Sequence, residues 1–141
     1  MAYEPGDLAI KMDDYKLNIR AAGVIIHNGK VLLHKKKSSD HCALLGGHVK
    51  IGENSQDTVK REMKEELGKE IEIIGYISTV ENFFELDGLK YHEIMFVYKA
   101  EFCEEEPLFL RRTSGRFSLK RRQDRFSFRA KLFRAHTDCN N

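Results

Sequence analysis

The sequence lacks the features that mark several large classes of protein. It has no tryptophan and two prolines, and no apolar run approaches the roughly 18 residues that a membrane-spanning helix requires. Its opening residues are acidic and show neither the basic flank nor the apolar stretch of a secretory signal. These absences argue against a membrane partner and against export, so we expect a cytoplasmic location.

Cysteine is also scarce. Cys42, Cys103 and Cys139 are odd in number, lie far apart and form no C-x-x-C pair. Disulfide-rich domains and thiolate zinc sites depend on closely spaced cysteines. The sequence therefore argues against both a disulfide framework and a cysteine zinc site.

The chain does have enough length for one hydrophobic core, together with an uneven charge. Its 141 residues, 41% hydrophobic and 33% charged, suit a single globular domain over residues 1–141. Residues 1–106 carry 14 basic and 20 acidic side chains, whereas residues 107–141 carry 10 basic and 2 acidic ones. We predict a flexible N-terminal extension (1–14) and an atypical basic C-terminal tail (107–141) around an acidic body.

Hydrophobic patterns predict strands on both sides of one helix. Residues 17–37 contain two runs rich in Ile, Val and Leu around Asn28-Gly29, a dipeptide that suits the tight turn of a β-hairpin. Residues 70–79 and 91–102 alternate between apolar and polar side chains, as strands do. Gly46-Gly47 predicts a sharp turn or a close approach to a ligand, and hence the start of a functional loop.

The predicted helix covers residues 55–67. Asn54 or Ser55 is the candidate N-cap, and Gly68 stands where a left-handed C-terminal residue is favoured. An apolar stripe recurs every four residues, at Val59, Met63 and Leu67.

Acidic side chains gather on one side of this helix. Because successive helical residues advance by about 100°, Glu62, Glu65 and Glu66 share one face. Such like charges repel one another unless a cation intervenes, and oxygen ligands suit a hard ion such as Mg²⁺. For the acidic run alone we would favour a different interpretation, a solvated helix face on which Arg61 pairs with Glu65.

The spacing of the surrounding residues favours the metal interpretation. The segment fits the pattern G-x5-E-x7-R-E-U-x-E-E-x-G, where U is a bulky apolar residue, at Gly47, Glu53, Arg61, Glu62, Met63, Glu65, Glu66 and Gly68. This pattern resembles the Nudix box. Two neighbouring positions depart from the family: Lys69 stands where an apolar residue is usual, and Leu45 stands where many members have proline. All the charged positions of the box are present.

The resemblance implies both a fold and an activity. Nudix domains are α/β proteins, αβα sandwiches with a mixed β-sheet, although poor helical periodicity in the tail predicts that a regular C-terminal helix is missing. The implied activity is that of a nucleoside diphosphate-X pyrophosphohydrolase, which hydrolyses the pyrophosphate linkage of a nucleoside diphosphate joined to another group. The implied cofactor is Mg²⁺, with Mn²⁺ as a substitute, and the implied partner is a nucleotide-type small molecule.

The resemblance also assigns the metal ligands. Glu62, Glu65 and Glu66 would bind the divalent ions, and the carbonyl of Gly47 would be a further ligand. Metal ions that bridge phosphate oxygens neutralise their charge and lower the pKa of a bound water, which then attacks phosphorus.

Further catalytic roles fall on residues in and beyond the box. The resemblance implies that Arg61 orients the carboxylates and that Glu53 assists through water. The general base varies in position within the family, and the two candidates are Glu66 and Glu93. An exposed charge on a strand is the alternative interpretation of Glu93.

Several residues outside the box are candidates for substrate contacts. His48 and His92 could touch phosphate, or could simply be solvated. Phe83, Phe84 and Tyr91 could stack on a base, whereas aromatic residues beside strands are more often part of a core. The identity of the nucleotide derivative stays open.

The tail supports a rival hypothesis. Its basic residues interleave with Phe117, Phe126, Phe128 and Phe133, a mixture that can bind phosphates and stack on bases; they are Arg111, Arg112, Arg116, Lys120, Arg121, Arg122, Arg125, Arg129, Lys131 and Arg134. The alternatives to the enzyme are therefore a nucleic-acid-binding protein and a catalytically inactive Nudix interaction domain. Phe117 with Leu119, and Phe126 with Phe128, alternate as in strands. If a closing helix is missing, a homodimer would cover the sheet face left open.

Overall fold

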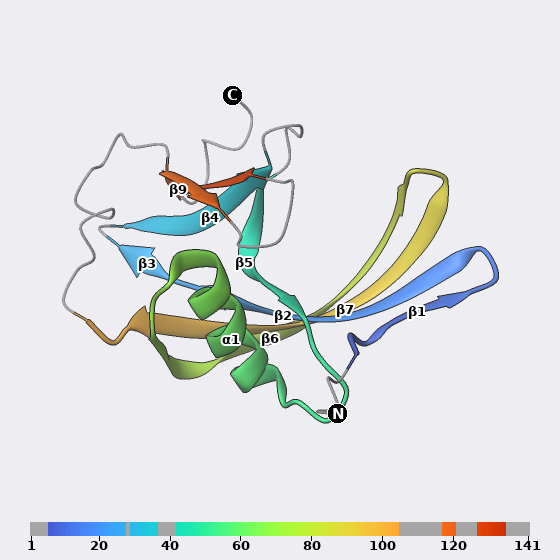
Figure 1. Cartoon of the computed structure of the whole chain (residues 1–141), viewed down its shortest axis with the longest axis horizontal. Helices are drawn as coiled ribbons and strands as arrows, with labels where there is room; N and C mark the ends of the chain where they lie inside the picture. The colour runs from blue at the N-terminus through green and yellow to red at the C-terminus, as the bar shows by residue number, and fades with distance from the viewer. Residues whose placement is uncertain (1–5, 28, 37–41, 105–116, 121–126, 135–141) are drawn as a thin grey trace.

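One helix and a mixed β-sheet make up the part of the chain that the structure describes. This computed structural model describes residues 6–27, 29–36, 42–104, 117–120 and 127–134 (Figure 1). The elements are β1 (Ala9–Met12), β2 (Tyr15–Val24), β3 (Ile26–His27), β4 (Lys30–Lys36), β5 (Cys42–His48), α1 (Ser55–Leu67), β6 (Ile71–Leu86), β7 (Leu89–Phe102), β8 (Phe117–Lys120) and β9 (Ser127–Arg134).

The strands form one sheet in the order β6-β7-β2-β5-β4-β9-β8, with β1 added to β2 and β3 added to β4. β2 and β7 pair in parallel, whereas the other neighbouring strands pair antiparallel. This confirms the predicted α/β architecture with a mixed sheet. Among the described residues α1 is the one helix, and no second helical layer faces it across the sheet.

Helix α1 has the bounds that its capping residues predict. The side chain of Asn54 accepts a hydrogen bond from the backbone N–H of Asp57 at 2.9 Å, which satisfies a donor of the first turn. Gly68 ends the helix at φ 67°, and its N–H donates to the carbonyl of Lys64 at 2.9 Å. The predicted stripe of Val59, Met63 and Leu67 is buried in the core, so this face holds the helix against the sheet.

The sheet beneath α1 allows the helix to pack closely against it. A Cβ atom on Gly23 of β2 would lie 2.9 Å from Met63 and 3.0 Å from Val59. Ala21, Leu45 and Tyr98 come from β2, β5 and β7 and complete the core under the helix. Absence of a side chain at Gly23 therefore brings α1 near the sheet.

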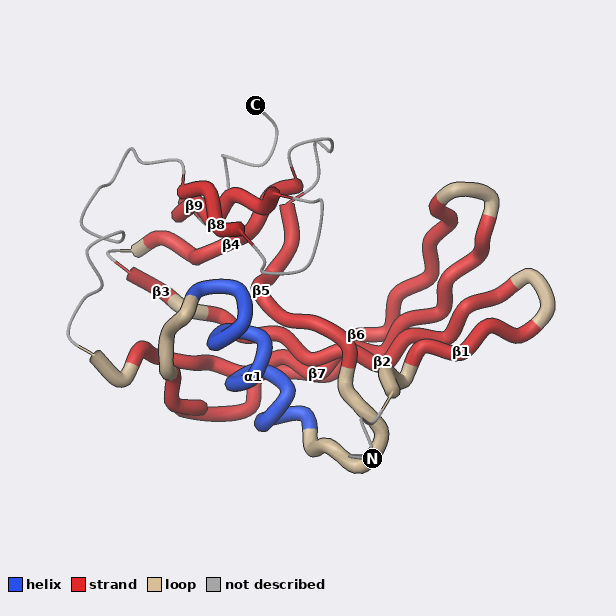
Figure 2. The backbone as a smooth tube through the Cα atoms, in the orientation of Figure 1, coloured by secondary structure: helices blue, strands red, loops and turns tan. Residues whose placement is uncertain are grey.

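Two hairpins extend beyond the body of the molecule (Figure 2). One joins β1 to β2 and the other joins β6 to β7, and their tips lie on the same side of the view. Strands β6 and β7 are longer than the strands predicted over residues 70–79 and 91–102. Asp87 and Gly88 turn the chain between them at φ 52° and 75°, as the Leu86-Asp87-Gly88 sequence suggests.

The hairpin predicted around Asn28-Gly29 is confirmed. His27 of β3 lies opposite Lys30 of β4, and Ile26 lies opposite Val31, so two residues connect the strands. Gly29 has φ 72°, a conformation that glycine adopts without steric cost.

The N-terminal segment differs from the flexible extension predicted over residues 1–14. β1 pairs with β2 from Ala9 to Met12, the N–H of Leu8 donates to the carbonyl of Val49 at 2.8 Å, and Leu8 packs against the core. The free edge of β2 gives this segment hydrogen-bond partners. The alternation of Leu8, Ile10 and Met12 is the sequence pattern that indicates a strand here.

Gly46 and Gly47 lie inside a strand, which corrects the prediction of a turn and a functional loop at this dipeptide. In β5 they pair with Ala22 and Ala21 of β2. A Cβ on Gly46 would collide with the backbone of Ala21, and a Cβ on Gly47 would collide with the carboxylate of Glu62. The dipeptide therefore allows close packing rather than a change of direction.

Part of the basic tail belongs to the sheet. β9 pairs antiparallel with β4, and β8 pairs with β9. This confirms the strand-like alternation read at Phe117 with Leu119. Phe126 lies outside the described residues, as do six of the ten basic residues: Arg111, Arg112, Arg116, Arg121, Arg122 and Arg125. The other four stand in strands, Lys120 in β8 and Arg129, Lys131 and Arg134 in β9. The tail's role in nucleic-acid binding stays a prediction.

Within the same described ranges, no helix is both long and apolar enough to cross a membrane.

Candidate active site

Arg61 lies at the centre of the charged residues that the box pattern selects. Its Nε donates to Glu53 Oε2 at 2.8 Å, and its Nη2 donates to Glu53 Oε1 at 3.0 Å. Nη1 donates to Glu62 at 2.9 Å and, more weakly, to Glu65 at 3.5 Å. Nη2 also donates to the carbonyl of His48 at 3.0 Å, so this one guanidinium ties α1 to the end of β5.

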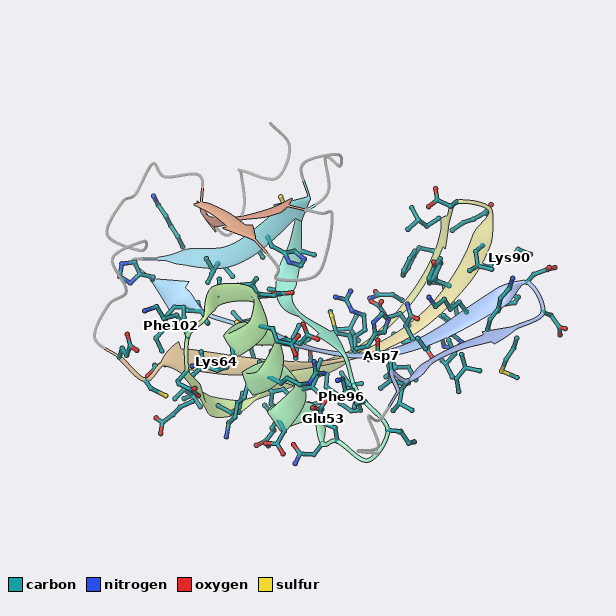
Figure 3. The ribbon with its side chains drawn as sticks, in the orientation of Figure 1. Asp7, Glu53, Lys64, Lys90, Phe96 and Phe102 are labelled. Carbon is teal, nitrogen blue, oxygen red and sulfur yellow. The ribbon has the colours of Figure 1, made fainter. Side chains whose placement is uncertain are left out.

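Glu53 is held on both oxygens. Besides Arg61, the hydroxyl of Thr58 donates to Oε1 at 2.6 Å and the backbone N–H of Lys50 donates to the same oxygen at 3.2 Å. Figure 3 shows Glu53 beside the N-terminal end of α1. Thr58 is fully buried and is a site residue that the box pattern does not reveal, because its position in the pattern accepts any residue.

Glu62 is pressed against Gly47. The side chain of Glu62 is 7% exposed, and its carboxylate occupies the space where a Cβ of residue 47 would lie. This places the Glu62 oxygens beside the backbone of β5. The structure thus brings together the carboxylate and the glycine backbone for which the family resemblance implies one metal site.

The other two helix carboxylates differ in exposure. Glu66, one turn beyond Glu62, is buried, whereas the side chain of Glu65 is 50% exposed. Their positions agree with the expected shared face of α1. A carboxylate in Glu66's position is shielded from bulk water, while Glu65 can reach an ion or a substrate from the solvent side.

The charges of Arg61 and Glu53 stabilise each other. The hydrogen bonds from Arg61, supported by Thr58 and the Lys50 backbone, lower the pKa of Glu53 from 4.5 to about 2. The same contact with Glu53 raises the pKa of Arg61, and Glu62 adds to that effect. Both groups are therefore ionised at neutral pH.

His48 follows Gly47 on β5. Burial lowers the pKa of His48 below 6.5, and nearby Arg20 lowers it further, while Asp7 acts in the opposite direction. His48 Nδ1 lies 3.8 Å from Asp7 Oδ2. A mainly neutral imidazole at pH 7 is the consequence.

Glu93 is not part of this group. Residues that face each other in paired strands point to the same side of a sheet, and successive residues alternate. Ala21 of β2 faces α1, so Asn18, three residues earlier, faces away, and Glu93 is paired with Asn18. Glu93 lies on the sheet side opposite the helix, where Arg20 Nη1 is 3.7 Å from its Oε2.

His92 and the three aromatic candidates are divided between the two sides. Phe83 and His92 lie on the helix side of the β6–β7 hairpin, with ring centroids 4.3 Å apart. Phe84 and Tyr91 stack on the opposite side, with centroids 4.8 Å apart and planes within 4°. The three aromatic side chains therefore do not form one platform.

The residues at α1 have the donor chemistry of a divalent-ion site. Glu62, Glu65, Glu66 and the Gly47 carbonyl offer oxygen ligands only, as Mg²⁺ prefers. Among the described residues, no three His, Cys, Asp or Glu side chains form a ready-made ion site. Arg61 supplies the positive charge between Glu62 and Glu65 instead, so ion binding requires these side chains to adjust.

Comparison with known proteins identifies the family. The family model described as NUDIX domain matches residues 17–126, which is most of the chain. The chain therefore belongs to the Nudix family.

Relatives agree with this assignment. The chain is 32% identical over 85 residues to an RNA pyrophosphohydrolase of Ruthia magnifica subsp. Calyptogena magnifica; the match covers 59% of this chain and 46% of the relative, so the chain spans about half the length of that relative. A MutT NUDIX hydrolase from Burkholderia pseudomallei shares the fold with a TM-score of 0.62 and 23% identity, over 83% of this chain and 82% of that one. A NUDIX hydrolase from Nitrosomonas europaea has a TM-score of 0.56 and 21% identity, over 84% and 72% of the two chains.

Proposed function

We propose that this protein hydrolyses the pyrophosphate linkage of a nucleoside diphosphate joined to another group, with Mg²⁺ held by Glu62, Glu65, Glu66 and the Gly47 carbonyl. Membership of the Nudix family supports hydrolysis of a pyrophosphate in general. The observation that carries the proposal is the contact of the buried Glu62 carboxylate with Gly47, next to Arg61.

Each residue of the group has a distinct task in this proposal. Mg²⁺, when bound, neutralises phosphate charge and lowers the pKa of a bound water. Arg61 keeps Glu62 and Glu53 in place through the hydrogen bonds described above. Glu66 accepts the proton of the attacking water, because it lies on the same helix face while Glu93 lies across the sheet. Glu53, fully ionised, fixes Arg61 and assists through water.

The direct test is turnover with Mg²⁺ on a panel of nucleoside diphosphate derivatives, followed by release of nucleoside monophosphate. We expect Glu66→Gln to lower the rate by about 10²- to 10⁴-fold, the usual contribution of a catalytic acid or base. Glu65→Gln removes the charge of a metal ligand and should also lower the rate. Activity should also disappear with a chelator.

Glu70→Gln is the matched control. Glu70 follows the helix and pairs on the surface with Lys64 at 2.9 Å, away from Gly47. It should retain full activity. Unchanged rates in both Glu65→Gln and Glu66→Gln would refute the metal and base assignments.

RNA with a 5′-terminal phosphate chain is a second candidate substrate. The relative named RNA pyrophosphohydrolase and the basic tail both favour it. A 5′-triphosphorylated oligonucleotide offered beside free nucleotides would decide. Release of pyrophosphate from the oligonucleotide at the higher kcat/KM supports RNA, and reaction with free nucleotides only excludes it.

A further inference from the structure

A row of polar side chains crosses the side of the sheet turned away from α1. It consists of Asn82 on β6, Glu93 on β7, Asn18 and Arg20 on β2, and His48 on β5, and we call it the polar row. The strand register places these residues together: Asn82 pairs with Glu93, Glu93 with Asn18, and Arg20 with His48. Five polar groups from four strands therefore meet on one surface of the sheet.

Contacts within the polar row are sparse. Asn82 Nδ2 donates to Glu93 Oε1 at 3.3 Å, and Arg20 Nη1 lies 3.7 Å from Glu93 Oε2. Both distances are long for interactions of a buried carboxylate, and Glu93 is 5% exposed. The row does not fully satisfy its own charges.

Three buried atoms of the row have no hydrogen-bond partner within the described structure. They are Asn18 Oδ1, Arg20 Nε and His48 Nε2. Asn18 is 5% exposed, so water has little access to its amide. Because leaving a buried polar group unpaired is unfavourable, a ligand that pairs with these atoms would be stabilised by the contacts.

An aromatic surface adjoins the polar row on the same side. Phe84 follows Asn82 on β6 by two residues, and Tyr91 precedes Glu93 on β7 by two residues. Each step is roughly 7 Å along the strand. Their rings are stacked, Phe84 is 41% exposed, and Lys16 Nζ lies 5.8 Å from the centre of the Tyr91 ring. A purine ring system can cover that distance, stacking on the aromatic pair while its edge reaches the row.

We propose that this surface binds the base of a guanine nucleotide, stacked beside Phe84 and Tyr91 and read by Arg20, Glu93 and Asn18. Guanine presents one acceptor, O6, beside two donors, N1–H and the N2 amino group. Arg20 Nε is a donor, and the Glu93 carboxylate and Asn18 Oδ1 are acceptors, which is the complementary set. Adenine presents a ring acceptor, N1, where guanine presents the N1–H donor, and would set that acceptor against an acceptor of the protein.

The guanine surface and the proposed metal site lie on opposite sides of the sheet, so the assignment does not rest on the proposed function. Binding itself needs no metal. Calorimetric titration of the full-length protein with GMP and with AMP, both in EDTA, therefore tests base recognition separately from hydrolysis. We expect at least about tenfold tighter binding of GMP, the usual discrimination of a bidentate contact.

Three variants test which residues produce the preference for GMP over AMP. Glu93→Gln replaces an acceptor by a donor and should reduce the GMP preference to less than about threefold. Asn18→Ala, checked for folding by circular dichroism, should weaken GMP binding and leave AMP binding nearly unchanged. Phe84→Leu should weaken the binding of GMP and of AMP by a similar factor, because stacking does not depend on which base is bound.

Glu81→Gln is the matched control. Glu81 precedes Asn82 on β6 but lies on the other side of the sheet, where it is 2.9 Å from His92. It should preserve the preference for GMP. Equal binding of GMP and AMP, absence of GMP binding, or a preference that survives Glu93→Gln would each overturn the proposal, whatever the outcome for hydrolysis.

Discussion

Buried carboxylates occur on both sides of the sheet, and the distances to their polar partners differ between the two sides. On the helix side, Glu62 shares Arg61 with Glu53 and Glu65, at distances as short as 2.8 Å. On the opposite side, Glu93 has Asn82 and Arg20 at 3.3 and 3.7 Å. In the first group Arg61 already pairs with the carboxylates, which adjust when an ion binds, whereas the second gains further hydrogen bonds only when a ligand supplies them.

The two groups suit the two roles proposed for them, catalysis on the helix side and recognition on the opposite side. Catalysis depends on groups that are fixed before the reaction, since reorganisation adds to the barrier. Recognition depends on polar atoms that are costly to leave unpaired, since those atoms reject a ligand that does not match them. Lys90 marks the far end of the projecting hairpin in Figure 3, well away from Glu53 at the helix.

Gly47→Ala changes the helix-side group at its closest contact, and it should have the greatest consequence of the variants that follow. The added methyl would collide with the Glu62 carboxylate and displace it. A displacement of about 1 Å at a reacting centre can reduce turnover by about 100-fold. Turnover with Mg²⁺ measures the loss.

Gly75→Ala serves as its control, because a Cβ on Gly75 meets no atom within 4 Å. GMP binding should survive in both variants, since Gly47 faces α1. Full activity of Gly47→Ala would contradict the role of this contact.

Arg61→Gln tests whether the helix-side group is held together by its central cation. Without Arg61, Glu53 and Glu62 lose a charged partner at 2.8 and 2.9 Å. Removing one member of a mostly buried ion pair leaves the other charge uncompensated, and the free energy of unfolding should fall by about 3 kcal/mol. Urea denaturation measures this, and Lys60→Gln, on an exposed neighbour, should change it by less than about 0.5 kcal/mol.

Glu53 makes the stability of the helix side depend on pH. Its pKa is lowered from 4.5 to about 2, so the folded state favours the ionised form. That stability is fully present above pH 4.5 and is lost as the pH falls towards 2. At about 1.36 kcal/mol per pKa unit, the contribution is at most about 3 kcal/mol.

Glu53→Gln should therefore be less stable than the parent protein at pH 6, and the difference should shrink at pH 4 and again at pH 3. Chemical denaturation at the three values gives the comparison. A difference that grows as the pH falls would show that Glu53 is not stabilised as an anion.

The helix side could be predicted from the sequence, whereas the opposite side could not. Asn54, the stripe of Val59 and Met63, and Gly68 specify α1 through local rules, and the box spacing selects Glu62 within that helix. Gly46-Gly47 predicts a sharp turn or a close approach to a ligand, because a glycine pair does not specify which group lies near; the structure places the Ala21 backbone and the Glu62 carboxylate there.

Contacts between strands that are far apart in the sequence could not be predicted, for a physical reason. Glu93 is brought to Arg20 by the parallel pairing of β2 with β7, which connects residues far apart in the chain. A shift of one residue in that register would turn Glu93 towards α1, and no local pattern specifies the register. Its placement away from the helix is therefore a result of the structure.

Asn82→Ala should have the least consequence, because it removes a single long contact of the polar row. The bond from Asn82 to Glu93 is long, at 3.3 Å, so its loss should lower the free energy of unfolding by about 1 kcal/mol or less. Urea denaturation without nucleotide provides that value. If the row is completed by its ligand, saturating GMP should stabilise the parent protein more than the variant, because Asn82 helps to position the Glu93 carboxylate that contacts the base. Equal stabilisation of the two proteins would show that Glu93 is positioned by Arg20 alone.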